Sequence, residues 1–203
     1  MKKIKFVYFD IGGVMCYTRD YFKRVTRKFN MPINDFVKFW QGDNFADEIT
    51  RGKISSEDFW KLAIKKFELK NAEDFNFVES WMDDYTPIKE VHKLAKNLSR
   101  KYKIGLISNI YSGMMPRLIE KGLVVDIKYS TMVLSSEVGL RKPEIEIYEL
   151  ATKKAGVLPE EILFIDDRLD FIEGAKSCGW QTIWLDENNI GKTIKEIEGL
   201  LGI

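Results

Sequence analysis

The chain has 203 residues, a length that suits one compact domain or one domain with a modest insertion. Its composition is 45% hydrophobic and 31% charged, which is enough for a buried core and excludes a disordered chain. Its 32 Lys and Arg residues nearly balance 31 Asp and Glu residues, so no net charge favours nucleic acid or an acidic membrane surface as a partner.

The N-terminal residues resemble a secretion signal only superficially. Lysines precede an apolar run, but Asp10 interrupts the run and no small-residue cleavage site follows it. No other segment approaches the length of a membrane span. Cys16 and Cys178 are too few for a disulfide framework, which favours a reducing compartment. We therefore expect a cytoplasmic protein, monomer or homodimer, that binds neither a membrane nor nucleic acid.

Five short runs rich in β-branched and aromatic residues predict strands. Several are nearly all apolar, as in a parallel sheet whose two faces are both covered by helices. The runs are residues 5–10, 103–109, 128–134, 162–167 and 181–186.

Helical patterns separate the last four of these runs. The first predicted helix has Thr86 as its N-cap and Pro87 as its first residue, and it extends to about Arg100. The other two cover residues 143–156 and 170–179, and each ends at a glycine. Strands that alternate with helices predict an open, Rossmann-like α/β fold with a parallel sheet of five or six strands.

The segment between the first and second predicted strands, residues 15–85, shows helical patterns and no convincing strand. One apolar stripe begins at Phe22 and another at Phe59, both at helical spacing. Most aromatic residues of this segment should pack in its own core, Trp40, Trp60 and Trp81 among them. We therefore expect an α-helical cap subdomain at residues 15–86, inserted into a core formed by residues 1–14 and 87–203.

Asp10 ends the first predicted strand and is followed by Ile11, Gly12 and Gly13. An aspartate there lies at the carboxyl edge of the sheet, where open α/β folds bind their ligands. The two glycines let the backbone come close to a phosphate or a metal ion. Taken alone, Asp10 would be explained equally well as an N-cap or turn aspartate.

Asp166 and Asp167 end the fourth predicted strand in the same way. Because adjacent carboxylates repel each other, two of them at the edge of a core strand indicate a shared cation. A turn with one capping aspartate is the alternative. Asp170 fits the N-cap of the next helix, with Glu173 in the position of a capping box.

Ser108 and Asn109 close the second predicted strand, and Lys142 stands just before Pro143 and a predicted helix. A hydroxyl and an amide at a strand-to-helix junction can bind phosphate oxygens. An ammonium group can neutralise a phosphoryl group and hold neighbouring carboxylates together. Each of these residues is common in turns, so only their joint order carries the argument.

Asp10, Ser108–Asn109, Lys142 and Asp166–Asp167 occur in the order of the four motifs of the haloacid dehalogenase-like superfamily, which the chain resembles over nearly its whole length. The helical insertion lies where the type 1 cap of that superfamily lies. Within the superfamily, the chain resembles the branch of small sugar-phosphate-type phosphatases in the segments FDIGGV, RGKISSEDFW, LISN, GLRKPEIEIY and FIDD.

The resemblance implies a phosphatase that uses Mg²⁺, with Asp10 and Lys142 as its catalytic residues. Asp10 would attack the phosphorus and form an aspartyl-phosphate. Mg²⁺ would be held by Asp10, the backbone carbonyl of Gly12 and Asp167, while Asp166 would act through water. The residues implied at the phosphate are Ser108, Asn109, Gly12, Gly13 and Lys142.

Gly12 departs from the usual first motif of the superfamily, which has an aspartate at this position as general acid and base. Loss of such a group typically lowers a rate about 10²–10⁴-fold. The branch named above often carries this glycine and is still regarded as phosphatase-like. Phe171 is a second departure, because many relatives carry Asn or Asp there.

The favoured hypothesis is Mg²⁺-dependent hydrolysis of a small phosphorylated metabolite, for example a sugar phosphate. The first alternative is a catalytically weak phosphate-binding or regulatory protein, in which Gly12 marks the loss of turnover. The second is a metal-independent 2-haloacid dehalogenase, against which the Asp166–Asp167 pair argues. Candidates for lining a substrate cavity from the cap are the polar residues Asp43, Asp47, Glu48 and Arg51, which spacing alone does not assign.

Overall fold

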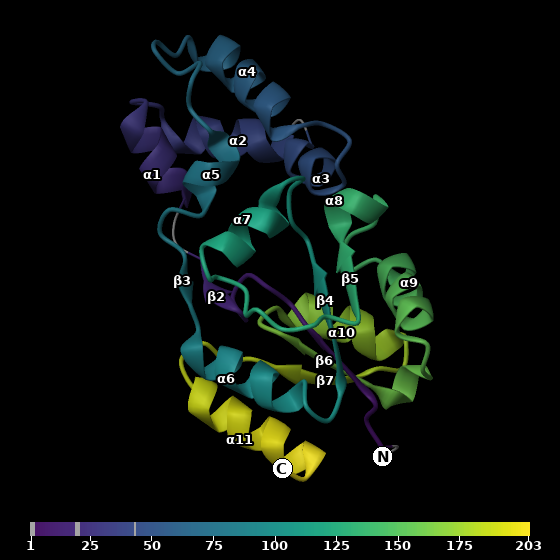
Figure 1. Cartoon of the computed structure of the whole chain (residues 1–203). Coiled ribbons are helices and arrows are strands. Elements are labelled where there is room, and N and C mark those ends of the chain that lie inside the picture. The colour runs from purple at the N-terminus through teal and green to yellow at the C-terminus, as the bar shows by residue number, and fades with distance from the viewer. Residues whose placement is uncertain (1–2, 19–20, 43) are drawn as a thin grey trace.

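A five-stranded parallel sheet forms the centre of the protein in the computed structural model, which describes residues 3–18, 21–42 and 44–203. The strand order is β5-β4-β1-β6-β7, so the first strand lies in the middle (Figure 1). The five strands lie within the five predicted runs, and the sheet has five strands rather than six. They are β1 (Phe6–Phe9), β4 (Lys103–Ser108), β5 (Thr131–Leu134), β6 (Ile162–Asp166) and β7 (Gln181–Trp184).

Helices cover both faces of the sheet, which explains why β1 and β6 are buried along their whole length. Val7 and Phe9 pack with the residues of α6 and α11, and these two helices lie side by side (Figure 1). Phe6 and Tyr8 point to the opposite face and pack with α9 and α10. These helices are α6 (Lys89–Leu98), α9 (Ile145–Ala155), α10 (Leu169–Ser177) and α11 (Ile190–Leu201).

Three short helical elements complete this part of the chain: one lies between β4 and β5, one between β5 and α9, and one between α9 and β6. They are α7 (Met114–Glu120), α8 (Ser135–Val138) and the 3-10 turn η1 (Pro159–Glu161).

The prediction of a helix starting at Thr86 and Pro87 was wrong. These two residues form strand β3 (Thr86–Pro87), which pairs antiparallel with β2 (Cys16–Tyr17), and α6 begins after them at Lys89. The expectation of no strand in residues 15–85 was wrong for the same reason. The pairing joins the two connections between sheet and insertion, a long-range contact that local helix signals do not report.

Two other helices begin at different residues from those predicted. Glu144 has an extended backbone at the N-cap position, so α9 begins at Ile145 rather than at Pro143. α10 begins at Leu169 with Arg168 at its N-cap, so the prediction of Asp170 as N-cap was wrong. The carboxylate of Asp170 instead accepts hydrogen bonds from the Arg168 side chain at 2.6 and 3.0 Å.

The described residues between β2 and β3 form five helices, which we call the cap and which lie together at one end of the molecule (Figure 1). Ser55 caps α4 by accepting a hydrogen bond from the Asp58 N–H at 3.0 Å. Aromatic residues fill the cap, as predicted, with Trp40 and Trp60 both buried. The five helices are α1 (Tyr21–Lys28), α2 (Ile33–Gly42), α3 (Phe45–Thr50), α4 (Ser56–Phe67) and α5 (Phe77–Trp81).

The cap approaches the rest of the protein closely at Gly52. The φ angle of this residue is +68°, and a Cβ atom added to it would lie 2.3 Å from the backbone oxygen of Ser136 in α8. Only glycine fits both conditions. The contact fixes the end of α3 against the segment that leads toward Lys142.

Candidate active site

The carboxyl edge of the sheet brings the predicted site residues together. Asp10 directly follows β1, and its N–H donates to the carbonyl of Ile165 in β6 at 3.0 Å. Because β1 lies between β4 and β6, Asp10 is flanked by Ser108 on one side and by Asp166 and Asp167 on the other. A cavity of about 340 Å³ opens at this edge, and Asp10, Gly12, Ser108, Asn109 and Asp167 line it.

Three carboxylates form one cluster at this edge. Asp10, Asp166 and Asp167 each offer an oxygen, and these oxygens lie within 4.8 Å of one another. Burial, with a contribution from the charge of Asp10, raises the pKa of Asp167 to about 6. Burial also raises the pKa of Asp166 above its ordinary value, although the charge of Lys142 opposes this. Oxygen-only donors with crowded negative charge suit a hard divalent cation such as Mg²⁺, so the residues present fit this ion.

Lys142 lies beneath the carboxylates and is fully buried. Its Nζ is 2.5 Å from Oδ2 of Asp166 and 2.9 Å from Oδ1 of Asp10, and the latter contact is an ion pair without hydrogen-bond geometry. Burial opposes charge on this ammonium group, but Asp10 and Asp166 outweigh it and raise the pKa of Lys142 above its ordinary value. A permanent cation therefore stands beside the Asp10 carboxylate.

Asn109 holds the backbone of Lys142 with a pair of reciprocal hydrogen bonds. Its side-chain amide donates to the Lys142 carbonyl at 2.9 Å, and its side-chain oxygen accepts the Lys142 N–H at 2.9 Å. The Asn109 side chain therefore ties the end of β4 to the loop that carries the lysine. Phe171 lies under the same lysine, with Nζ 4.6 Å from its ring centre.

Of the two adjacent glycines, only Gly13 has a backbone conformation and surroundings that require glycine. Gly13 has a φ angle of +78°, and a Cβ atom on it would lie 2.2 Å from Oδ2 of Asp167. Any side chain there would displace this carboxylate. Gly12 has no such backbone requirement, and its Cβ atom would meet Cγ2 of Thr18 at 3.2 Å. The backbone conformation at position 12 therefore does not explain why an acid–base side chain is missing there.

Comparison with known proteins agrees with this arrangement. The sequence profile of the haloacid dehalogenase-like hydrolases matches residues 4–179. The chain belongs to this family. It is therefore an enzyme, a hydrolase with the order of motifs described above.

Two relatives match the hydrolase over most of both chains. It is 26% identical over 193 residues to the D-ribitol-5-phosphate phosphatase of Bacteroides thetaiotaomicron, covering 88% of this chain and 90% of the relative. It is 24% identical over 204 residues to a pyrimidine 5′-nucleotidase of Escherichia coli, covering 92% and 88%.

Among solved structures, the hydrolase resembles a HAD family enzyme of Bacteroides thetaiotaomicron in complex with magnesium and inorganic phosphate. The TM-score is 0.74 at 22% identity, over 91% of this chain and 95% of that chain. At this identity the likeness establishes the shared fold.

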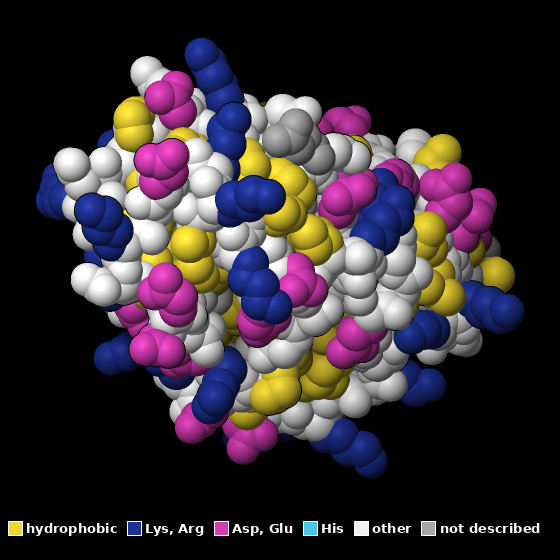
Figure 2. Space-filling view, turned by 90° about the horizontal axis from the view of Figure 1, so that it is seen from above, with side chains coloured by type: hydrophobic (Ala, Val, Ile, Leu, Met, Phe, Trp, Pro, Cys, Tyr) yellow, Lys and Arg dark blue, Asp and Glu magenta, His cyan; other side chains and the backbone are white. Residues whose placement is uncertain are grey.

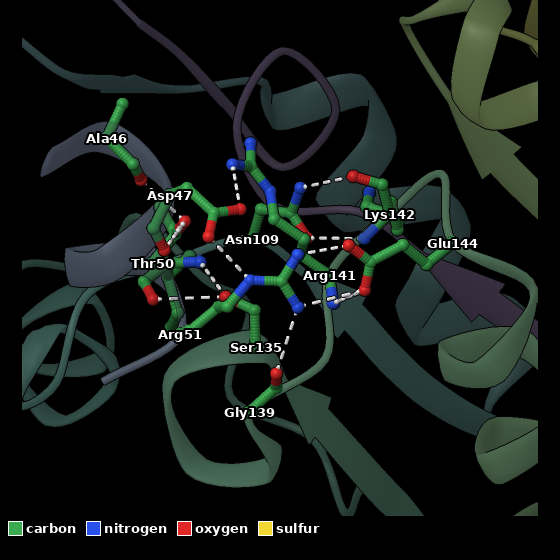
Figure 3. A network of polar contacts seen from close by, with 11 residues as sticks. Ala46, Asp47, Thr50, Arg51, Asn109, Ser135, Gly139, Arg141, Lys142 and Glu144 are labelled. Carbon is green, nitrogen blue, oxygen red and sulfur yellow. Dashed lines mark hydrogen bonds and ion pairs between the residues drawn. The ribbon is translucent and has the colours of Figure 1, made fainter. Parts of the chain in front are cut away.

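Two of the polar cap candidates of the hydrolase, Asp47 and Arg51, belong to an ion-pair network rather than to the cavity lining. Asp47 and Arg51 are not among the residues that line the cavity, and neither is Glu48, while Asp43 lies outside the described residues. Arg51 instead places its guanidinium between two carboxylates, that of Asp47 in α3 and that of Glu144 just after Lys142 (Figure 3).

A network of ion pairs thus joins the cap of the hydrolase to the segment that carries Lys142 (Figure 3). Arg51 contacts Asp47 at 2.7 Å and donates to Glu144 and to the carbonyl of Gly139 at 3.0 and 3.1 Å. Asp47 also accepts a hydrogen bond from Arg141 at 3.0 Å. Lys142 therefore lies between two residues, Arg141 and Glu144, that the cap holds.

Several residues that line the cavity of the hydrolase were missed by sequence reasoning. Arg141 and Arg168 are next to predicted site residues in the chain, which is the signal that could have found them. Tyr111 follows Asn109 closely and carries the same signal. The spacing of Trp40 and Trp81 indicated only a buried helix face, and nothing in it distinguished a cavity wall from a core.

Seen from the cap end, the surface of the hydrolase carries Lys, Arg, Asp and Glu side chains mixed with one another (Figure 2). Among the described residues, no broad area of a single sign covers this face (Figure 2). In the part of the chain that the structure describes, the helices are too short or too polar to cross a bilayer.

Proposed function

We propose that this hydrolase is a Mg²⁺-dependent phosphatase that cleaves a phosphate monoester of a small metabolite through an aspartyl-phosphate on Asp10. One observation carries the proposal above all. The Asp10 carboxylate faces the cavity while its Oδ1 is only 2.9 Å from the buried ammonium of Lys142, and two further carboxylates complete a cation site beside it.

In the first half of the reaction, a carboxylate oxygen of Asp10 attacks the phosphorus and the bond from phosphorus to the ester oxygen breaks. The departing alcohol oxygen takes a proton from solvent, because Gly12 offers no acid. Lys142 holds the Asp10 carboxylate in place and neutralises charge at the reacting centre. Ser108 and the backbone of Gly12 line the cavity beside Asp10, where they would bind phosphate oxygens.

In the second half, water attacks the phosphorus of the aspartyl-phosphate, releases inorganic phosphate and restores the Asp10 carboxylate. Mg²⁺ would be held by Asp10, Asp167 and the Gly12 carbonyl, and it would supply positive charge against the phosphoryl oxygens. Asp166 acts at a distance, because its Oδ2 contacts Lys142 and its Oδ1 accepts the Arg168 N–H at 2.8 Å.

The comparisons support the reaction class more than the substrate. One relative is named for a polyol phosphate and another for pyrimidine nucleotides, at 26% and 24% identity, so the leaving group differs among proteins about equally similar to this one. The similar fold that holds magnesium and inorganic phosphate supports the choice of metal and of the transferred group.

We also propose that the chain divides into a core, residues 1–14 and 87–203, and a cap, residues 15–86. The antiparallel pair of β2 and β3 supports this division, because it closes the insertion at both of its ends. The two free thiols, Cys16 and Cys178, are in keeping with a cytoplasmic enzyme. Either a monomer or a homodimer is compatible with a site formed within one chain.

A catalytically weak phosphate-binding protein is the second candidate, and Gly12 is the observation that favours it. Among the described residues that line the cavity, the only carboxylic acid other than Asp10 is Asp167, which belongs to the cation site. The two candidates differ in turnover and agree in phosphate binding.

Hydrolysis of p-nitrophenyl phosphate tests the proposal. We expect phosphate release with Mg²⁺ and none after chelation, and we expect Asp10→Asn to abolish it while Asp170→Asn, an exposed carboxylate paired with Arg168, leaves it intact. Activity that resists a chelator, or chloride release from a chlorinated acid, would contradict the proposal. Mg²⁺-dependent phosphate binding without turnover would favour the second candidate.

A further inference from the structure

The lining of the cavity combines charged side chains with aromatic rings. The charged side chains among the described residues that line it all come from outside the cap: Asp10, Arg141, Asp167 and Arg168. Four further lining residues present aromatic rings, which we call the aromatic wall: Trp40, Trp81, Tyr85 and Tyr111.

Three rings of the aromatic wall contact one another and form one continuous surface. The Tyr111 ring centre is 5.2 Å from that of Trp81 and 6.0 Å from that of Trp40, and the two indoles are 5.6 Å apart. Tyr111 stands three residues after the last residue of β4, Ser108. The wall is therefore connected through Tyr111 to the strand that ends at Ser108.

The aromatic wall carries no charge. Burial raises the pKa of Tyr111 well above its ordinary value, and burial likewise raises the pKa of Tyr85, so both hydroxyls stay protonated. Thr50 also lines the cavity, but its hydroxyl already donates to the Ala46 carbonyl at 2.6 Å. Thr18, which lies between β2 and α1, adds a second threonine hydroxyl to the cavity lining.

Such a wall discriminates between leaving groups. A polyol carries a hydroxyl on each carbon, and each one loses water on entering the cavity and needs a new partner. Tyr85 and Trp81 hydrogen bond with each other, and Trp40 and Tyr111 are buried, so the wall leaves few polar atoms for such hydroxyls. A flat ring would instead gain stacking and edge contacts with the wall. The cavity volume of about 340 Å³ is near the lower limit for small-molecule sites, which suits a single ring next to a phosphate.

We propose that the leaving group of the substrate is an alcohol that carries a planar, apolar ring, and that the aromatic wall is its binding site. This inference rests on the proposed function and names the substrate class for it. Trp81 and Tyr85, which are half-buried, act as specificity-determining residues, while Trp40 and Tyr111 support them from buried positions.

The test compares three phosphate esters of primary alcohols, so that the acidity of the leaving group stays similar: benzyl phosphate, cyclohexylmethyl phosphate and ribitol 5-phosphate. With Mg²⁺ we expect kcat/KM for benzyl phosphate to exceed that for ribitol 5-phosphate by about tenfold or more, mostly through KM. Equal values for these two esters would overturn the proposal. Equal values for the benzyl and cyclohexylmethyl esters would overturn the preference for a planar ring.

Variants assign the effect to the wall. Trp81→Leu should lower kcat/KM for benzyl phosphate several-fold more than it lowers kcat/KM for ribitol 5-phosphate. Phe67→Leu is the matched control, because Phe67 packs in the cap against Phe36 and Phe39 and does not line the cavity, and it should keep the parent preference. If Trp81→Leu fails to fold in a thermal melt, Tyr85→Leu replaces it with the same expectation.

Binding separates this inference from the proposed function. If the protein hydrolyses neither these esters nor p-nitrophenyl phosphate, the proposed function fails. Calorimetry with benzylphosphonate and 2,3-dihydroxypropylphosphonate in the presence of Mg²⁺ then decides the inference. Binding of the benzyl compound about tenfold tighter supports the aromatic wall as its site, and equal or weaker binding overturns it.

Discussion

Arg51 at the end of α3 and Glu144 just before α9 form a forked ion pair that connects the cap to the Lys142 segment. Both side chains are mostly buried, with 17% and 33% of their surfaces exposed. Arg51 also lowers the pKa of Glu144 below its ordinary value. A contact from the cap therefore holds the segment that carries Lys142.

Removal of this ion pair should reduce activity more than stability. We expect Arg51→Met to lower kcat/KM about tenfold, because the cap then no longer holds Glu144 and Gly139 on either side of Lys142, and only the contact of Arg141 with Asp47 remains. Arg51→Lys should recover little, since an ammonium group cannot replace the fork. Lys61→Met is the control, because Lys61 pairs with Asp58 on the exposed face of α4. Equal losses in Arg51→Met and Lys61→Met would contradict the coupling.

Replacement of Lys142 should affect both chemistry and folding. Lys142→Ala leaves the carboxylates of Asp10 and Asp166 buried without their cation, so we expect at least about a 10²-fold loss of kcat and a lower melting temperature. Added Mg²⁺ should raise that melting temperature more than it raises that of the parent. Lys176→Ala, which removes an exposed lysine of α10, should change neither quantity.

A carboxylate restored at position 12 should act as the missing acid. Gly12→Asp needs only a small shift of Thr18, so we expect a folded protein whose rate on poor alkoxide leaving groups rises by up to about 10²-fold. Leaving groups that need no proton, such as p-nitrophenolate, should gain least.

Gly13→Ala is the contrasting variant at the neighbouring position. Its Cβ atom would lie 2.2 Å from the Asp167 carboxylate on a backbone with positive φ, so we expect loss of Mg²⁺ binding and of stability. If a stably folded Gly12→Asp protein keeps the leaving-group dependence of the parent, another group supplies the proton.

Mg²⁺ affinity should fall in mild acid. The folded pKa of Asp167 is raised to about 6, so this carboxylate binds a proton as the pH falls through 6, and the proton competes with the metal. Below pH 6 we expect Kd for Mg²⁺ to rise by up to about tenfold per pH unit, measured by calorimetry. An Asp167→Asn protein should bind Mg²⁺ weakly and with less dependence on pH.

The sequence by itself was enough to predict the five strands and the order of the motifs. Parallel strands covered on both faces must be apolar along their whole length, so each one stands out locally, and a polar residue at its end marks the edge of the sheet. This is why Asp10, Ser108, Asp166 and Asp167 were found without any knowledge of which strands are neighbours.

Two features depend on contacts between distant segments, and only the tertiary structure determined them: the pairing of β2 with β3 and the surroundings of Trp81. The pairing of Thr86–Pro87 with Cys16–Tyr17 overrides a local helix signal, because a ladder across the whole insertion stabilises the extended conformation. The spacing of Trp81 is the same whether its ring faces a core or a cavity. Which of the two it faces depends on Tyr111, which β4 places 5.2 Å away, and periodicity along one helix does not encode that distance.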